Sequence, residues 1–180
     1  GLEFAEGIPG TVGGTVFMNA GSYGGQMSDV VREVTLVDAG GSLVRRQLAP
    51  SDFGYRRSAF TAQEVIVEAV FQLSPGDPRE LESRMREISS RRLKSQPPGE
   101  RSAGCIFKNP AGDSAGRLID ALGLRGLSVG GASISMVHGN FIVNRGDATP
   151  ADVMELIGRV KAKVKEISGV TLEEEVIVWS

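Results

Sequence analysis

The stretch Val65-Ile66-Val67-Glu68-Ala69-Val70-Phe71 is followed by Ser74-Pro75-Gly76-Asp77-Pro78 and then by a charged, periodic segment at 79–94. The first segment is rich in β-branched residues, which predicts a strand. The prolines and glycine of the second predict a loop. In the third, apolar residues recur at spacings of four and three, which predicts an amphipathic helix. The cluster Gln96-Pro97-Pro98-Gly99 ends this helix, and we place a domain boundary after residue 97.

The rest of the chain continues the alternation of strands and helices. Upstream, the pattern predicts turns over the glycine-rich start and two strands at 30–37 and 43–48, joined by Asp38-Ala39-Gly40-Gly41 as a hairpin. Downstream, it predicts a short helix at 115–122 before Gly123, strands at 133–137 and 140–143, a long helix from Thr149 to Gly169, and a final strand at 172–179. The chain is therefore predicted to be an α+β protein with two lobes, residues 1–97 and 98–180.

Composition excludes several classes of protein. The 180 residues carry 20 basic and 22 acidic side chains, for a net charge of −2, whereas nucleic-acid-binding domains show a basic excess. Apolar runs stop well short of the ~20 residues that cross a membrane, and no signal-peptide pattern opens the chain. One cysteine and one histidine cannot build a disulfide or a thiol/imidazole zinc site, so we expect no metal. We expect a soluble, cytoplasmic monomer.

Glycine is the compositional outlier, with 24 residues that bunch near the start of the chain. The densest run is Gly7-Ile8-Pro9-Gly10-Thr11-Val12-Gly13-Gly14, followed by Asn19-Ala20-Gly21. Closely spaced glycines expose backbone N–H groups that bind phosphate. The same run is also typical of a tight structural corner. It lacks the Lys-Ser/Thr ending of a P-loop and does not match the dinucleotide fingerprint, so both interpretations stay open.

Two further segments carry reactive side chains. One is Phe53-Gly54-Tyr55-Arg56-Arg57-Ser58, where a guanidinium among aromatic residues suits the binding of a carboxylate or phosphate. The alternative is that the two arginines are a solvated pair on the surface. In Ser102-Ala103-Gly104-Cys105-Ile106-Phe107-Lys108-Asn109-Pro110, the thiol is a candidate nucleophile or proton donor, or a small buried apolar residue. With His138 as its partner, Cys105 would make a Cys–His hydrolase, although His138 is more typical of a structural residue near a strand end.

The acidic run Glu173-Glu174-Glu175 opens the predicted final strand. Strand periodicity places Glu173 and Glu175 on one face and Glu174 on the other. A carboxylate among the following valines and isoleucine is costly to bury unless it is paired or protonated, which is how a functional acid is often made. A solvent-facing acidic strand start is the equal alternative.

Taken in this order, the segments resemble the UDP-N-acetylenolpyruvoylglucosamine reductase family, the flavoenzymes of bacterial cell-wall precursor synthesis. Each motif alone is modest, but their order along essentially all 180 residues is highly specific. The matching pieces are Gly7 to Gly14, Met18-Asn19-Ala20-Gly21, Tyr55-Arg56 with Ser58, Ser102 to Cys105, Phe107 to Pro110, Asn140 to Asn144, and Leu172-Glu173 with Glu175-Val176.

The resemblance implies the later part of an FAD-binding α+β domain at 1–97 and a smaller α+β substrate-binding domain with a C-terminal catalytic strand at 98–180. It implies that NADPH reduces tightly bound FAD, and that the flavin passes hydride to the double bond of UDP-N-acetylglucosamine enolpyruvate. The product is UDP-N-acetylmuramate for peptidoglycan, on which cell shape and division depend.

The resemblance also implies a role for each matching residue. Arg56 and a protonated Glu175 would stabilise the enolate, and Cys105 would deliver the proton to carbon. The remaining contacts fall on two sets. For flavin they are Gly7, Ile8, Pro9, Gly10, Thr11, Gly13, Gly14 and Asn19; for substrate they are Tyr55, Lys108, Asn109 and Asn140.

The sequence departs from the family pattern in three places. Family members carry a further N-terminal region with a Gly-Ser-Asn-type loop, which these residues do not supply, so we expect a fragment. The family's proton donor is commonly serine where this chain has Cys105, and a thiol preserves that role. The short stretch before Cys105 resembles members that lack an extra substrate-covering loop. A different flavin oxidoreductase on the same scaffold and a UDP-sugar-binding domain without redox chemistry remain the alternatives.

Overall fold

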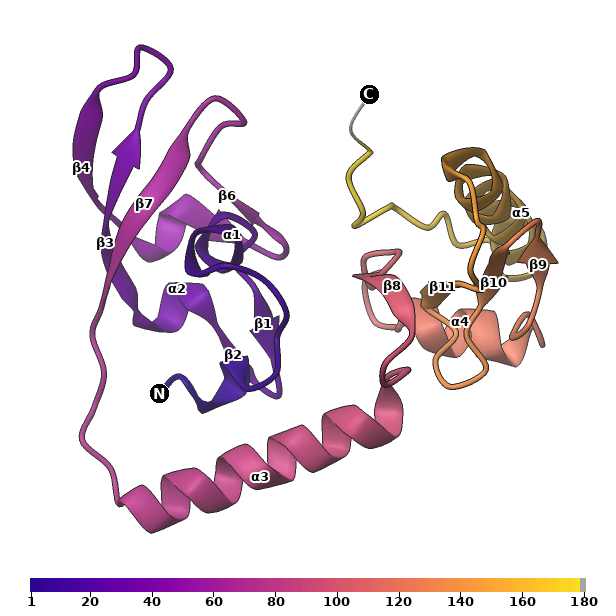
Figure 1. The fold of residues 1–180 in the computed structure, drawn as a ribbon, viewed down its shortest axis with the longest axis horizontal. Helices are drawn as coiled ribbons and strands as arrows, with labels where there is room; N and C mark the ends of the chain where they lie inside the picture. Colours follow the sequence, from indigo (N-terminus) through magenta and orange to yellow (C-terminus); the bar gives the residue numbers. More distant parts are fainter. Residues whose placement is uncertain (179–180) are drawn as a thin grey trace. The chain divides into compact units, whose positions relative to one another are not determined.

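The computed structural model describes residues 1–178, and these divide into two compact units, one of Gly1–Arg92 and one that begins at Leu93 (Figure 1). We call them the N-terminal and C-terminal units. Each combines helices with a separate antiparallel sheet, so the predicted α+β class is confirmed. The division falls inside helix α3 (Pro78–Ser95), slightly before the prolines that mark the sequence-based boundary.

The N-terminal unit is built on a three-stranded sheet of order β4-β3-β7. These strands are β3 (Val31–Val37), β4 (Leu43–Gln47) and β7 (Val65–Phe71), as predicted. The hairpin between β3 and β4 forms because the Asp38 carboxylate accepts bonds from the N–H groups of Gly40 and Ser42, both at 2.9 Å. One face of the sheet buries Val34 and Leu36 in the core.

Short elements surround that sheet and carry the predicted cofactor and arginine segments. They are η1 (Glu3–Ala5), α1 (Val12–Phe17), α2 (Met27–Val30), η2 (Pro50–Asp52), the hairpin of β1 (Gly21–Ser22) with β2 (Gly25–Gln26), and the hairpin of β5 (Phe53–Gly54) with β6 (Arg57–Ser58).

Helix α1 corrects the prediction of turns throughout the glycine-rich start. Thr11 caps it, because its hydroxyl oxygen accepts the Gly14 N–H at 3.1 Å. A Cβ on Gly13 would lie 2.9 Å from the Ile66 carbonyl oxygen, so glycine lets α1 approach β7 closely. Favourable capping and packing therefore outweigh the low helix propensity of glycine.

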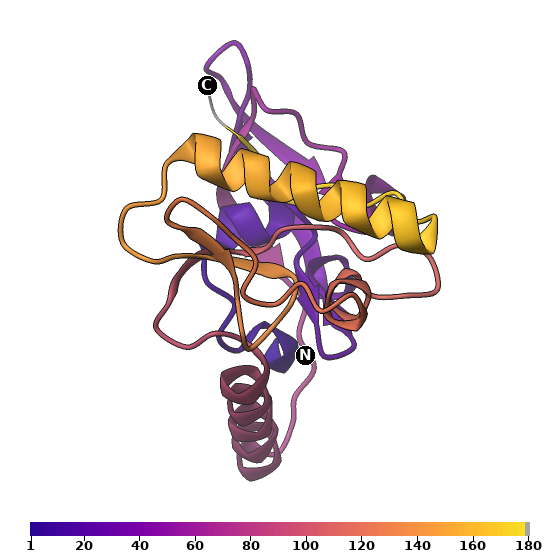
Figure 2. The same cartoon turned by 90° about the vertical axis from the view of Figure 1, so that its right-hand side faces the viewer.

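The C-terminal unit has a four-stranded sheet of order β8-β11-β10-β9. Its strands are β8 (Arg101–Cys105), β9 (Ser128–Val129), β10 (Ala132–Ile134) and β11 (Phe141–Asn144), and its helices are α4 (Ala115–Ala121) and α5 (Pro150–Ser168). Helix α5 packs on β9 and β10 through a buried stripe and runs along the unit in Figure 2. The predicted Thr149 cap and Gly169 stop of α5 are confirmed.

The structure corrects two predicted strands in this unit. Strand β10 ends at Ile134, because Ser135 turns the chain by accepting the Val137 N–H at 3.1 Å. The predicted final strand is an extended segment with one isolated antiparallel bridge, Glu174 to Phe107. The bridged residue Phe107 lies beyond the end of β8 at Cys105, so no longer ladder forms there. Trp179 lies outside the described residues.

Candidate active site

The segment Cys105–Asn109 follows β8 and is held by Asn140 at the start of β11. The Asn140 carbonyl oxygen accepts the Ile106 N–H at 3.0 Å. Its side-chain amide pairs with Phe107 twice, accepting the Phe107 N–H at 2.9 Å and donating to the Phe107 carbonyl at 2.8 Å. Asn140 is only 2% exposed. The Asn140 amide therefore bonds the backbone close to Cys105. We expected this side chain to contact substrate.

The C-terminal segment holds the same residues from their other side. The Glu175 N–H donates to the Ile106 carbonyl at 2.7 Å, and the Lys108 N–H donates to the Glu173 carbonyl at 2.8 Å. The Lys108 ammonium also pairs with the Glu173 carboxylate. The backbone that follows Cys105 is thus joined to residues 173–175, which lie far along the sequence.

Only the first two residues of this segment, Leu172 and Glu173, follow the predicted alternation between faces. Leu172 is buried, Glu173 is exposed, and Glu174 turns back to pair with Lys161 of α5 at 2.6 Å. That ion pair, with burial opposing it, lowers the pKa of the Glu174 carboxyl. The Glu174 carboxylate is therefore engaged in an ion pair with α5, whereas the Glu175 backbone N–H bonds the Ile106 carbonyl next to Cys105.

Asn109 connects this segment to helix α4. Its side-chain oxygen accepts the Ala115 N–H at 3.0 Å, one residue beyond the Ser114 cap. The position of Asn109 is therefore set by the start of the helix.

The predicted arginine lies at the tip of the β5–β6 hairpin. Arg56 has a φ of +54°, a left-handed conformation that is uncommon for a residue with a side chain. Its guanidinium carbon lies 5.2 Å from the centre of the Tyr55 ring. Such conformations persist only where the surroundings enforce them, and they concentrate at functional sites.

Asn19 supplies part of that enforcement. It is 2% exposed; its amide nitrogen donates to the Gly54 carbonyl at 3.1 Å, and its amide oxygen accepts the Ser28 N–H at 2.9 Å. Ser58 completes the support by donating to the Phe17 carbonyl at 2.5 Å. Asn19, which we expected to contact flavin, therefore braces the hairpin that carries Arg56.

Part of the glycine-rich segment is exposed to solvent. Gly10 has a φ of +140°, which only glycine adopts readily, and no atom lies within 4 Å of the Cβ position it lacks. Residues 9–12 are exposed and lead directly into the first turn of α1, where backbone N–H groups point outward. Arg56 and this segment belong to the N-terminal unit, whereas Cys105 and Glu175 belong to the C-terminal unit.

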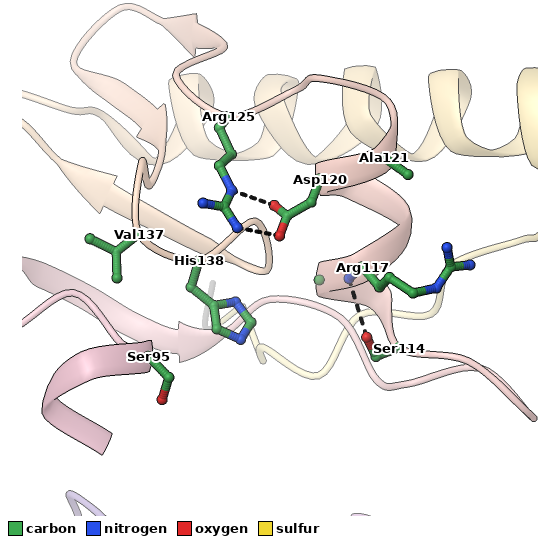
Figure 3. Close-up of a pocket in the computed structure, with 9 residues that line it drawn as sticks. Ser95, Ser114, Arg117, Asp120, Ala121, Arg125, Val137 and His138 are labelled. Carbon is green, nitrogen blue, oxygen red and sulfur yellow. Dashed lines mark hydrogen bonds and ion pairs between the residues drawn. The ribbon is translucent and has the colours of Figure 1, made fainter. Parts of the chain in front are cut away.

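Sequence reasoning missed a cavity of about 640 Å³ in the C-terminal unit. It is lined by Ser95, Ser114, Gly116, Arg117, Asp120, Ala121, Arg125, Val137 and His138 (Figure 3). Asp120 and Arg125 form a two-pronged ion pair on its wall. A methyl group on Gly116 would lie 2.9 Å from the His138 ring, so the imidazole fits closely against α4. The lone histidine was the only sequence signal for this cavity.

Comparison with known proteins gives the same order of segments. The C-terminal domain model of UDP-N-acetylenolpyruvoylglucosamine reductase matches residues 96–179, and an FAD binding domain model matches residues 1–46. The reductase of Alkalilimnicola ehrlichii is 49% identical over 98% of this chain, and that of Chlamydia felis is 48% identical over 98%. The crystal structure of the Thermus caldophilus reductase matches all of this chain with a TM-score of 0.88 and 44% identity.

The chain belongs to the UDP-N-acetylenolpyruvoylglucosamine reductase family. It spans 59% of the length of the two curated reductases and 64% of the crystallised one. None of the helices within residues 1–178 is long and apolar enough to span a membrane.

His138 lines the cavity described above. Burial lowers the pKa of the imidazole, with the Asp120 carboxylate partly opposing that shift. Nδ1 accepts the Asn140 N–H at 3.1 Å, which leaves the proton of the neutral ring on Nε2. The cavity is thereby connected, through Asn140, to the backbone that follows Cys105.

We predict that the C-terminal unit loses stability as the pH falls from 7.5 to 5.5. The unfolded imidazole, with a pKa near 6.5, takes up a proton in this range that the folded one resists. Urea unfolding at several pH values measures the effect, and NMR of the single histidine gives its pKa directly. His138→Gln should remove the slope, and an equal slope in that variant would contradict the assignment.

We predict that Asn140→Ala lowers the free energy of unfolding of the C-terminal unit by about 3 kcal/mol, because the buried Phe107 N–H and C=O both lose their partner. Asn144→Ala is the control, since Asn144 bonds only the N–H groups of Gly146 and Ala148 in an accessible turn. It should cost under ~1 kcal/mol by urea unfolding. Equal costs for the two variants would refute a special role for the Asn140 amide.

Proposed function

We propose that this chain belongs to an enzyme that reduces UDP-N-acetylglucosamine enolpyruvate to UDP-N-acetylmuramate, with FAD as cofactor and NADPH as reductant. The observation that carries the proposal is the bonding of the backbone next to Cys105 to the segment that holds Glu175, through Ile106 and Lys108, in a chain of this family. NADPH and UDP-sugars are cytoplasmic metabolites, and we place the reaction in the cytoplasm.

The residues of the glycine-rich segment fit an FAD pyrophosphate. In support of this, Gly10 has open space where a side chain would be, residues 9–12 are exposed, and they lead into the capped start of α1, a kind of backbone that suits a phosphate. In this proposal Gly7, Ile8, Pro9, Thr11, Gly13 and Gly14 shape the surface, and Asn19 acts through the hairpin it braces. FAD, when bound, supplies the hydride chemistry.

Arg56 and Glu175 would stabilise the charge that develops on the substrate. Hydride addition to the enolpyruvyl double bond moves negative charge toward its carboxylate, so donors must converge on that group. A guanidinium presents paired N–H donors to a carboxylate. The left-handed backbone of Arg56 fixes the direction in which its side chain leaves the hairpin. A protonated Glu175 would donate a further hydrogen bond to the enolate.

Cys105 would donate the proton that completes the product. It ends β8, opposite Phe141, and is half-buried, so its thiol is held by a paired strand. The S–H bond breaks as a C–H bond forms on the carbon that received no hydride, and the thiolate then recovers a proton from solvent. Serine or cysteine satisfies this requirement.

The remaining substrate contacts would come from Tyr55 in the N-terminal unit and from several residues of the C-terminal unit. Lys108 and Asn109 flank the clamped backbone, and Tyr55 lies beside Arg56 in the N-terminal unit. The His138 cavity offers a neutral imidazole donor, hydroxyl groups and paired guanidinium groups, which suit the polar edges of a nucleotide. Asn140 would contribute by positioning Phe107 and His138.

The proposal predicts a yellow full-length protein that oxidises NADPH only when the enolpyruvyl UDP-sugar is added. The reduced protein, mixed anaerobically with that sugar, should recover its oxidised-flavin absorbance. Reoxidation by oxygen with indifference to the UDP-sugar would favour a different flavin oxidoreductase. Tight binding of the sugar to a colourless protein would favour a binding domain without redox chemistry.

Cys105→Ala tests the proton-donor role separately. We expect flavin reduction by NADPH to stay at the wild-type rate, while reoxidation by the substrate slows by about 10² to 10⁴, the usual contribution of a positioned acid. Stopped-flow absorbance measures both half-reactions, and Cys105→Ser should retain most of the activity. Equal loss of both half-reactions in Cys105→Ala would count against the role.

A further inference from the structure

Arg92, in the last turn of α3, joins that helix to the residues that precede the glycine-rich segment. Its Nε–H donates to the Glu6 carbonyl at 3.1 Å, and Nη2 donates to the Ser22 hydroxyl at 3.0 Å. The guanidinium carbon lies 5.5 Å from the centre of the Tyr23 ring. These contacts span 70 and 86 residues of sequence, and all lie within the N-terminal unit.

The contacts of Arg92 continue into the turn at Gly7. The Ser22 hydroxyl in turn donates to the Phe4 carbonyl at 3.0 Å. Phe4 and Glu6, the two ends of this bend, are therefore both held by hydrogen bonds. Gly7 has a φ of +70°, and a Cβ there would lie 3.0 Å from the Arg92 side chain. The arginine stem therefore occupies the space beside the first glycine of the segment.

We propose that Arg92 is a positioning residue for the flavin-binding segment Gly7–Gly14. It fixes the direction in which the chain leaves Glu6, so that the glycine-rich backbone is ordered before the cofactor arrives. Ordering a loop in advance removes part of the entropy cost of binding. The inference rests on the proposed function, because it takes FAD as the ligand of that segment.

The chemistry of the side chain explains why arginine occupies this position. Its planar fork donates in two directions while its face covers an aromatic ring, which a single ammonium group cannot do. The neighbouring Arg91 provides the contrast, since it pairs only with Glu87 on the exposed face of α3 at 2.6 Å. Adjacent arginines of equal charge thus differ in whether they reach the segment.

The test compares Arg92→Met, Arg92→Lys and Arg91→Met in the full-length protein stripped of FAD. Fluorescence titration with FAD gives the dissociation constant, and hydrogen exchange of the apoprotein reports the order of residues 4–14. We expect Arg92→Met to bind FAD about tenfold more weakly, as for the loss of one charged hydrogen bond, and to exchange faster over 4–14. Arg92→Lys should fall between it and wild type, and Arg91→Met should match wild type in both measurements.

Three results would overturn the inference. Arg92→Met could match wild type in both measurements. It could lose FAD affinity with unchanged exchange, which would mean that Arg92 touches the cofactor directly. Arg91→Met could show the same losses, which would mean a general effect of charge. If Arg92→Met does not fold, Ser22→Ala removes the relay to Phe4 and should raise exchange over 4–14 with a smaller loss of FAD affinity.

A failure of the proposed function would be visible in the wild-type protein, which would then bind no FAD. The failure of this inference would appear only as the lack of a difference between the Arg92 variants and wild type.

Discussion

The hydrogen bonding of the Ile106 and Phe107 backbone is the constraint on which the C-terminal unit's chemistry depends. Asn140 bonds these residues from one side, and Glu175 bonds Ile106 from the other. Cys105, just before them, and Lys108, just after them, are therefore positioned by residues from two other segments of the unit. Without this arrangement, a thiol at the end of a strand and a carboxyl near the end of the chain would have no defined relation.

The two units use the same device to hold a functional loop. In each, the side-chain amide of a buried asparagine hydrogen-bonds backbone groups close to a candidate catalytic residue. Asn19 does so near Arg56, and Asn140 near Cys105. Both are 2% exposed, whereas Tyr55 and Asn109, in the segments they hold, are exposed. Such hydrogen bonds hold the backbone rigidly, which is what preorganised binding and catalysis require. In the N-terminal unit, Arg92 extends this principle to the start of the glycine-rich segment.

Sequence patterns within single segments predicted most of the helices and strands, but few of the hydrogen bonds that hold the loops. Strands 31–37 and 65–71 and helix α5 follow from β-branched runs, apolar periodicity and caps that lie within each segment. Helix α1 was missed because its stability comes from the fit of Gly13 against Ile66, a contact between distant residues. The prediction of a regular final strand was wrong because the residue it pairs with, Phe107, lies beyond the end of β8 at Cys105. Asn19 and Asn140 were recognised as special, but only tertiary contacts show that their amides face the backbone.

The central claim is that Arg56, Cys105 and Glu175 act on one enolpyruvyl group. A crystal structure of the full-length protein with FAD and the UDP-sugar substrate tests it most directly. The account predicts the Arg56 guanidinium and the Glu175 carboxyl within hydrogen-bond reach of the substrate carboxylate, and the Cys105 sulfur facing the carbon that accepts the proton. A substrate bound with any of these three side chains directed elsewhere would contradict the mechanism.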